Sequence, residues 1–148
     1  MPRHFGFRAL RHALLIICLA MYADVLRAAE PAPLAIRGYD PVAYFTEGRA
    51  TAGSADFEHT WDGYRYRFVS AAHRELFKAD PLRYAPQFEG TCSMALVLGY
   101  KDEADPENWL ISDNKLYVFK GPLGPSRFGA EVSESVRKAR ETWLNLPK

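Results

Sequence analysis

Cysteine is scarce in this chain, which has only two in 148 residues, Cys18 and Cys92. Cys18 falls in an N-terminal segment that has the features of an export signal, so the mature protein keeps Cys92 alone. A single cysteine has no partner within its own chain, which excludes a fold held together by internal disulfides. Cys92 is therefore a free thiol, a ligand or an intermolecular link.

The chain also lacks an excess of charge of either sign and a long hydrophobic run. Its 19 basic and 18 acidic residues nearly balance, and removing residues 1–29 takes away four arginines and one aspartate, which leaves a slightly acidic protein. Neither nucleic acid nor an anionic membrane surface is an expected partner of such a chain. The apolar stretch 13–23 is too short to span a bilayer, so no stable membrane span is expected after cleavage.

Residues 1–29 have the pattern of a signal peptide. Arg3, Arg8 and Arg11 form a positively charged start, the apolar stretch follows, and small alanines close the segment. We therefore expect export, most simply to the periplasm. An extended linker over 30–37, which contains two prolines, then leads into one domain over 38–148.

Histidine is equally scarce, because His59 and His73 are the only two left after residue 29. If Asp62-Gly63 forms a two-residue turn, His59 faces Tyr66, and Phe57 faces Phe68, on the aromatic side of a hairpin. A slip of one residue would mix the aromatic and polar faces, so the pattern fixes the register. The sequence thus predicts that His59 points inward.

The remaining elements predict a small single α+β domain, with two β-hairpins packed against short helices and a longer C-terminal helix. Ser70 is the expected N-cap of a helix over 71–79, in which His73, Leu76 and Phe77 share one inward face. Asp80-Pro81 starts a second short helix.

A short buried helix is expected between Gly90 and Gly99, opening near Cys92. A second hairpin follows over Trp109–Phe119, with Asp113-Asn114 as its turn. We expect Gly121 to Pro125 to form a rigid loop, which is followed by a last helix over 130–145. The sequence shows no internal repeat.

Several of these motifs resemble the YHS domain in its secreted single-domain form with an N-terminal signal peptide. The resemblance covers residues 36–119, and its matching marks are Gly38-Tyr39-Asp40-Pro41-Val42-Ala43-Tyr44-Phe45, Asp62-Gly63, Asp80-Pro81, Cys92, and Asp105-Pro106 with Trp109. It implies a small α+β module, of a kind that is attached in some proteins to metal-transporting ATPases. It implies no particular activity for the secreted members.

The metal-associated members resemble a Phe-Cys-Ser-x-x-Cys pattern, from which this chain departs. Here the first cysteine is replaced by Val69 and the second by His73, so two thiolates are missing. The resemblance alone therefore does not predict a zinc knuckle. His59 matches the histidine of the family's naming motif, although its neighbours do not match.

The sharpest functional hypothesis is a metal or redox site formed by Cys92, His59 and His73. A thiolate and two imidazoles suit copper or zinc, and Met94 could add a thioether that favours Cu(I). The competing interpretation is that each of these side chains is a packing residue of the core. The protein would then be a non-catalytic interaction domain that binds a small apolar ligand or a partner protein.

Enzymatic function has less support in the sequence. No Ser-His-Asp arrangement or phosphate-binding glycine loop is visible, and Ser70 near His73 lacks a carboxylate to orient the base. A thiol-dependent enzyme using Cys92 is a third alternative.

Overall fold

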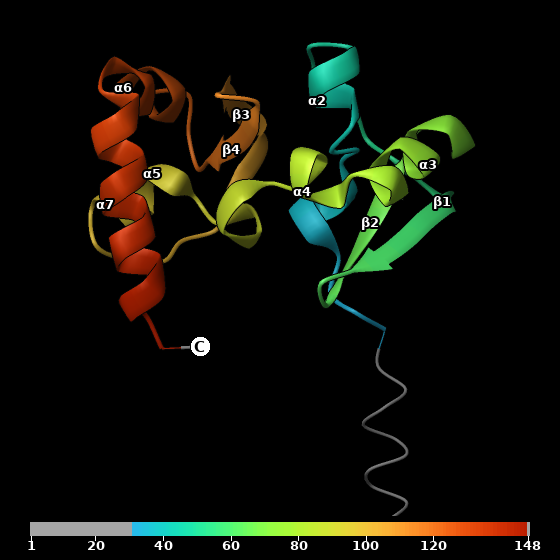
Figure 1. Cartoon of the computed structure of the whole chain (residues 1–148), viewed down its shortest axis with the longest axis horizontal. Coiled ribbons are helices and arrows are strands. Elements are labelled where there is room, and N and C mark those ends of the chain that lie inside the picture. The colour runs from blue at the N-terminus through green and yellow to red at the C-terminus, as the bar shows by residue number, and fades with distance from the viewer. Residues whose placement is uncertain (1–30, 148) are drawn as a thin grey trace, which may run out of the picture. The chain divides into compact units, whose positions relative to one another are not determined.

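The computed structural model describes residues 31–147, so the predicted signal peptide lies outside the described residues. Within them the structure is α+β, with two antiparallel hairpins, short helices and a longer C-terminal helix (Figure 1). The first elements are the 3₁₀ turn η1 (Ala35–Gly38), α2 (Ala43–Thr46), β1 (Ser54–Trp61), β2 (Tyr64–Phe68), α3 (Ala71–Ala79) and α4 (Pro81–Tyr84). The 3₁₀ turn η2 (Gln87–Gly90), α5 (Ser93–Val97), β3 (Asp105–Ser112), β4 (Lys115–Phe119), α6 (Gly124–Ala130) and α7 (Val132–Asn145) follow.

The turns of both hairpins form as predicted. Asp62 and Gly63 have φ values of 48° and 78°, and Asp113 and Asn114 have values of 48° and 57°. Two successive positive φ values match the right-handed twist of the flanking strands and favour Asn, Asp and Gly. The expected pairing of Trp109 with Val118 in the second hairpin is confirmed.

The register of the first hairpin is confirmed near the turn and wrong at its far end. His59 pairs with Tyr66, as expected, but Phe68 pairs with Ser54 rather than with Phe57. A register shift between Ser54 and Glu58 accounts for the difference. Counting outward from a turn fails wherever a strand carries extra residues.

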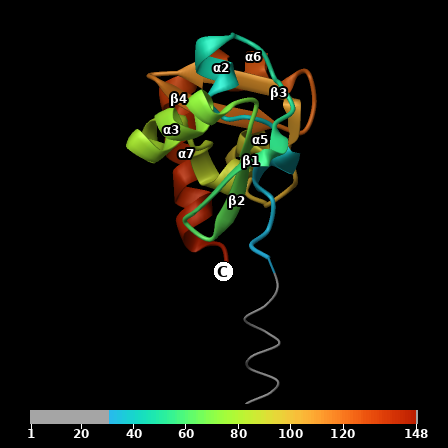
Figure 2. The same cartoon turned by 90° about the vertical axis from the view of Figure 1, so that its right-hand side faces the viewer.

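The helix signals before α3 and α4 are confirmed. The Ser70 hydroxyl accepts a hydrogen bond from the His73 backbone N–H at 3.2 Å, and Asp80 caps α4 in the same manner. α3 lies against the first hairpin (Figures 1 and 2) and buries Phe77 there. Leu76, which we expected to face inward, is 42% exposed, because only the His73–Phe77 edge of the helix faces the strands.

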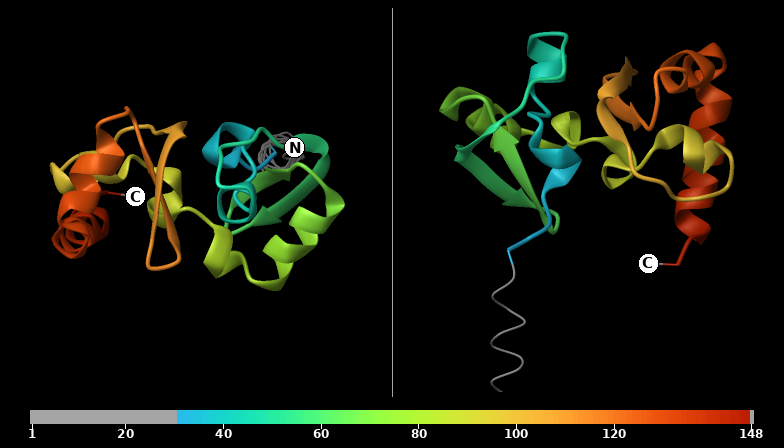
Figure 3. Two further views of the ribbon diagram at one scale, coloured as in Figure 1. Left: turned by 90° about the horizontal axis from the view of Figure 1, so that it is seen from above. Right: turned by 180° about the vertical axis from the view of Figure 1, so that it is seen from behind.

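Two predicted boundaries differ from the structure. Leu34 forms a parallel bridge with Arg65, and Ala35 and Ile36 are buried, so the fold begins inside the expected linker over 30–37. The expected loop after residue 121 turns into the helix α6 at Gly124. The last helix forms as predicted, and α5 and α7 pack against each other (Figure 3).

The structure contains a repeat that the sequence did not reveal. Both 3₁₀ turns carry two non-glycine residues of positive φ and then a glycine, namely Ile36-Arg37-Gly38 and Phe88-Glu89-Gly90. Each turn leads to a short helix, an eight-residue strand, a five-residue strand and another helix. Both hairpins also carry a register shift at their far end. Residues 34–84 and 86–146 are therefore two structurally equivalent halves.

Equivalent aromatic residues occupy the two halves. The rings of Phe68 and Phe77 are 5.3 Å apart, and those of Phe119 and Phe128 are 5.4 Å apart. Tyr66 contacts Phe77 at 4.6 Å, and Tyr117 contacts Phe128 at 5.0 Å. In each half, one buried phenylalanine of the following helix thus packs against the hairpin.

The two halves share one hydrophobic cluster. The Tyr44 hydroxyl donates to the buried Pro106 carbonyl at 3.0 Å, and its ring packs edge-on against Trp109 at 5.3 Å. Across the same boundary Tyr64 donates to Glu89 at 2.8 Å. These contacts make the halves parts of a single packed unit.

In residues 31–147, no helix has the length and apolar character needed to cross a bilayer.

Candidate functional site

Asp40 is a fully buried carboxylate that organises the first half. Its Oδ1 accepts from the backbone N–H groups of Val42 at 2.8 Å and Ala43 at 3.3 Å, which fixes the start of α2. Its Oδ2 accepts from the Val69 N–H at 2.8 Å and contacts His73 Nδ1 at 2.7 Å. A buried carboxylate is stable when donors surround it, as they do here.

His73 is oriented by this carboxylate. Because an ionised carboxylate can only accept, Nδ1 carries the hydrogen and donates to Asp40. The other ring nitrogen, Nε2, lies 3.4 Å from the Thr46 hydroxyl. That hydroxyl donates to the Val42 carbonyl at 3.1 Å, which occupies its hydrogen. The hydrogen bond between Asp40 and His73 therefore fastens the start of α2 to α3, and the Thr46 hydroxyl is not poised for attack.

His59 packs against aromatic side chains of the first half. It lies on β1 opposite Tyr66, and its ring packs edge-on against Phe77 at 6.3 Å. It faces inward as predicted, among aromatic rings.

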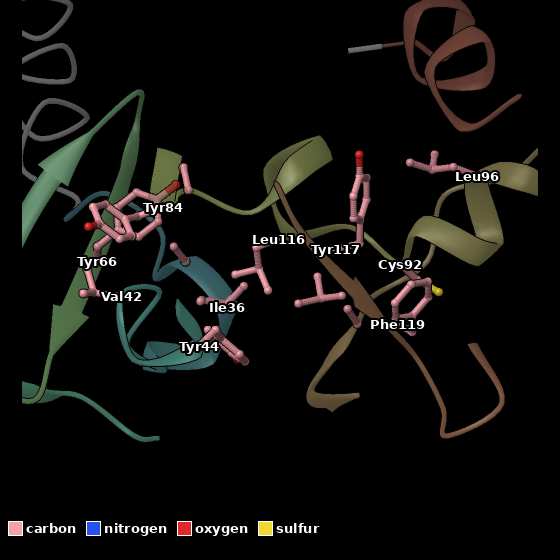
Figure 4. Close-up of a cluster of buried hydrophobic side chains, with 14 of the residues drawn as sticks. Ile36, Val42, Tyr44, Tyr66, Tyr84, Cys92, Leu96, Leu116, Tyr117 and Phe119 are labelled. Carbon is pink, nitrogen blue, oxygen red and sulfur yellow. The ribbon is translucent and has the colours of Figure 1, made fainter. Parts of the chain in front are cut away.

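Cys92 lies in the second half, just before α5, and is only 3% exposed. Its Sγ accepts a hydrogen bond from the Lys120 backbone N–H at 3.2 Å. The side chain of Lys120 pairs with Asp102 at 2.7 Å, which raises the pKa of Lys120 and lowers that of Asp102. Figure 4 shows Cys92 and Phe119 at one end of the buried cluster and Tyr66 at the other.

A cavity of about 300 Å³ is lined in part by Cys92. Its lining includes the buried residues Cys92, Ala95 and Phe119 and the exposed residues Leu98, Tyr100 and Leu123. We call it the Cys92 pocket. Its size is at the small end of the range for ligand sites, and an apolar lining with a few polar groups is typical of them.

The mouth of the Cys92 pocket gathers exposed apolar side chains. Leu98, Tyr100 and Leu123 are 63%, 48% and 60% exposed. Exposed apolar side chains that cluster, in contrast to scattered ones, mark binding surfaces. A ligand or partner at this mouth would remove them from water.

Asp40 and Cys92 are equivalent positions in the two halves. The Asp40 N–H donates to the Thr51 carbonyl and the Cys92 N–H to that of Asp102, at 2.8 and 3.0 Å. Each side chain then accepts from the first residue after its hairpin, Val69 or Lys120. The sulfur of Cys92 thus occupies the place of the Asp40 carboxylate.

The partner of that position differs between the halves. His73 precedes Phe77 by one helical turn, and the residue at the same place before Phe128 is Gly124. Gly124 lines the Cys92 pocket, and a Cβ at this position would lie 2.5 Å from the Phe119 Cβ, so the Phe119 side chain fills the space next to it.

The three residues expected to form one metal site are not brought together. His59 and His73 lie in the first half, on β1 and α3, whereas Cys92 lies in the second. Residues 31–147 hold no group of three or more His, Cys, Asp or Glu side chains arranged for a metal ion. The hairpin pattern predicts that a side chain points inward. It does not predict which half of the core the side chain enters.

Sequence reasoning missed Asp40 and the Cys92 pocket. Asp40 was noted only as part of the motif from Gly38 to Phe45, although its second oxygen holds His73 and Val69. A comparison of residues 34–80 with 86–131 would have found the signal, because Gly38, Ala43, Tyr66, Phe68 and Phe77 recur as Gly90, Ala95, Tyr117, Phe119 and Phe128.

Comparisons with known proteins identify no relative. No family model matches the chain, and neither a curated protein nor a solved structure matches it.

Proposed function

We propose that this chain is an exported, non-catalytic binding protein of the YHS type, whose small apolar ligand occupies the Cys92 pocket. The observation that carries the proposal is that three exposed apolar side chains lie at the mouth of a cavity of about 300 Å³. Fully burying an exposed leucine side chain is favourable by about 1.5–3 kcal/mol, so such a mouth favours an apolar ligand.

Binding fits this site better than thiol catalysis does. A cysteine nucleophile needs a neighbouring base, normally an imidazole, to remove its proton. The lining of the Cys92 pocket contains no histidine, and His59 and His73 belong to the other half. The sulfur instead accepts from a backbone N–H.

Soft-metal handling is a second candidate, because Cys92 and Met94 line the same pocket. Thiolate and thioether sulfur together favour Cu(I), which tolerates few ligands. Zinc needs four ligands in a structural site. A copper site here would use these two sulfurs and neither histidine.

The test uses the mature protein and a panel of small apolar probes, with binding followed by amide chemical shifts. Leu123→Lys should weaken binding at the pocket mouth by about tenfold, since it removes the transfer energy of one exposed leucine. Leu82→Lys is the matched control, because Leu82 is similarly exposed, at 68%, and lies in the first half. Equal binding by both variants, or no shifts around Cys92 with any probe, would contradict the proposal.

Metal analysis of the same protein separates the two candidates. Stoichiometric copper that is lost in Cys92→Ser and reduced in Met94→Leu supports the metal function. Metal-free protein with the probe-dependent shifts described above supports the small-ligand function.

A further inference from the structure

A second cavity, of about 220 Å³, shares no lining residue with the Cys92 pocket. Among the described residues that line it, none is Lys, Arg or His, five are aromatic and two are acidic. These seven are Trp61, Tyr64, Tyr66, Phe88, Trp143, Asp62 and Glu89, and we call the site the aromatic cavity. A lining of this composition is electrostatically suited to a positively charged ligand.

Four of the aromatic rings form two pairs, one from each half. The ring centroids of Trp61 and Tyr66 are 6.4 Å apart, and those of Phe88 and Trp143 are 6.1 Å apart. The face of such a ring attracts a cation that lies within about 6 Å of its centroid. Trp143 already attracts one cation, because Lys101 Nζ lies 5.0 Å from its centroid, and Lys101 does not line the aromatic cavity.

The carboxylates of Asp62 and Glu89 supply the negative charge of this site. Neither takes part in an ion pair with a basic side chain of residues 31–147. Burial, and after it the negative charge of Asp62, raises the pKa of the Tyr66 hydroxyl. The negative potential thus reaches a residue in the wall of the cavity, where it favours a cation.

The Tyr66 hydroxyl has no hydrogen-bond partner within residues 31–147, although the residue is only 3% exposed. The side-chain nitrogen and oxygen atoms of these residues that are fully enclosed without a partner are Arg65 Nε and Ser93 Oγ. The Tyr66 hydroxyl is not one of them, so it lies at the small exposed part of a residue that lines the aromatic cavity. Because buried polar groups normally have a partner, this hydroxyl indicates a place for a ligand atom.

We propose that the aromatic cavity binds a small, free organic cation with a trimethylammonium head group, of the choline type. The head group would lie against the aromatic rings, with Asp62 and Glu89 at the exposed rim. The site is separate from the Cys92 pocket and does not depend on the ligand proposed there. Its volume is below the range of about 300–1,000 Å³ for drug-sized ligands, which suits a head group of a few atoms.

A methylated ammonium fits this lining better than a primary ammonium does. A primary ammonium has three N–H donors, and each needs an acceptor when it leaves water. Aromatic rings provide no such acceptors, and the carboxylates are exposed at the rim. A trimethylammonium group has no N–H to satisfy, and aromatic cages are the usual sites for it.

The experiment titrates the mature protein at low ionic strength with choline and with its neutral analogue, in which a tert-butyl group replaces the trimethylammonium group. The readout is the indole N–H resonances of the three tryptophans. Trp61 and Trp143 line the aromatic cavity and should shift, whereas Trp109, which packs against Tyr44, should not.

For a ligand of this size we expect a Kd for choline in roughly the millimolar range. The neutral analogue should bind about tenfold more weakly, since it lacks a partly desolvated cation–π contact. Equal binding of the two compounds, or no shift of Trp61 and Trp143 with choline, would overturn the proposal. Phosphocholine distinguishes a free cation from a lipid head group. Because Asp62 and Glu89 repel its phosphate, it should bind more weakly than choline, and tighter binding would contradict the assignment to a free cation.

Charge-removing variants test the carboxylates. Asp62→Asn should weaken choline binding by about threefold, as expected for one exposed charge, and asparagine is favoured in this type of turn. Asp113→Asn is the matched control, because it makes the same change at the equivalent turn position of the second hairpin, which does not line the cavity. Equal effects of the two variants would refute the role of Asp62.

A charge-adding pair separates this site from the Cys92 pocket. Leu82 is 68% exposed and lines the aromatic cavity, so Leu82→Lys puts a competing positive charge there. We expect it to weaken choline binding by at least about tenfold. Leu123→Lys, which tests the Cys92 pocket, should leave choline binding unchanged. If instead Leu123→Lys weakens choline binding and Leu82→Lys does not, choline occupies the Cys92 pocket and the proposal is wrong.

Discussion

Replacing Asp40 should destabilise the protein far more than replacing its equivalent, Cys92. In Asp40→Ala, the backbone N–H groups of Val42 and Val69 lose bonds of 2.8 Å and the His73 ring loses one of 2.7 Å. A buried donor left without its acceptor costs about 1–3 kcal/mol, and part of this is recovered when water enters. We expect a loss of about 3–5 kcal/mol in the free energy of unfolding, the range found when one member of a buried polar pair is removed.

Asp40→Asn is the sharper variant because it preserves the side-chain volume. The amide keeps one acceptor for the N-terminus of α2 but points its NH₂ group toward the Val69 N–H, so two donors face each other. We expect a loss of about 2–3 kcal/mol. Since domains of this kind unfold with about 5–15 kcal/mol, both variants should remain folded enough to measure.

The assay is urea unfolding followed by tryptophan fluorescence, with Cys92→Ala as the matched variant. Cys92 Sγ accepts only the longer contact of 3.2 Å from Lys120, so its removal should cost about 1–2 kcal/mol. A double-mutant cycle with His73→Ala should show a coupling of about 1–3 kcal/mol with Asp40. The reasoning is refuted if Asp40→Ala costs no more than Cys92→Ala, or if the coupling is zero.

Two further predictions concern other contacts. Gly124→Ala should lower the free energy of unfolding by about 1–3 kcal/mol, because its Cβ would meet the Phe119 Cβ at 2.5 Å, whereas Gly121→Ala, with open space around it, should be nearly neutral in the same urea assay. The hydrogen bond to Glu89 raises the pKa of Tyr64 to about 12, so the hydroxyl stabilises the fold fully below the unfolded pKa of 10 and this stabilisation is lost as the pH rises toward 12. Tyr64→Phe should flatten this part of the stability profile in unfolding curves measured from pH 9 to 12, and an unchanged slope would count against the Glu89 contact.

The local signals in the sequence were sufficient for most of the elements. Ser70, with its hydroxyl, and Asp62-Gly63, with its tolerance of positive φ, act within a few residues of their own position, and both behaved as predicted. The register at Phe57 was wrong because the shift in β1 depends on how the far end of the strand packs. α6 was missed because its first turn is rich in glycine and proline, which are turn residues when judged locally.

The sequence by itself determined the fold class, the hairpin turns, the helix caps and the presence of one cysteine, Cys92, within residues 31–147. The sequence could not predict which side chains meet at the site. Hydrophobic periodicity gives the direction in which a side chain points, but it does not identify the residue that it contacts across the core. Only the tertiary structure separated Cys92 from both histidines, joined His73 to Asp40, and showed the two halves to be equivalent. The equivalence depends on backbone geometry, such as the two positive φ values before Gly38 and before Gly90, which few identical residues record.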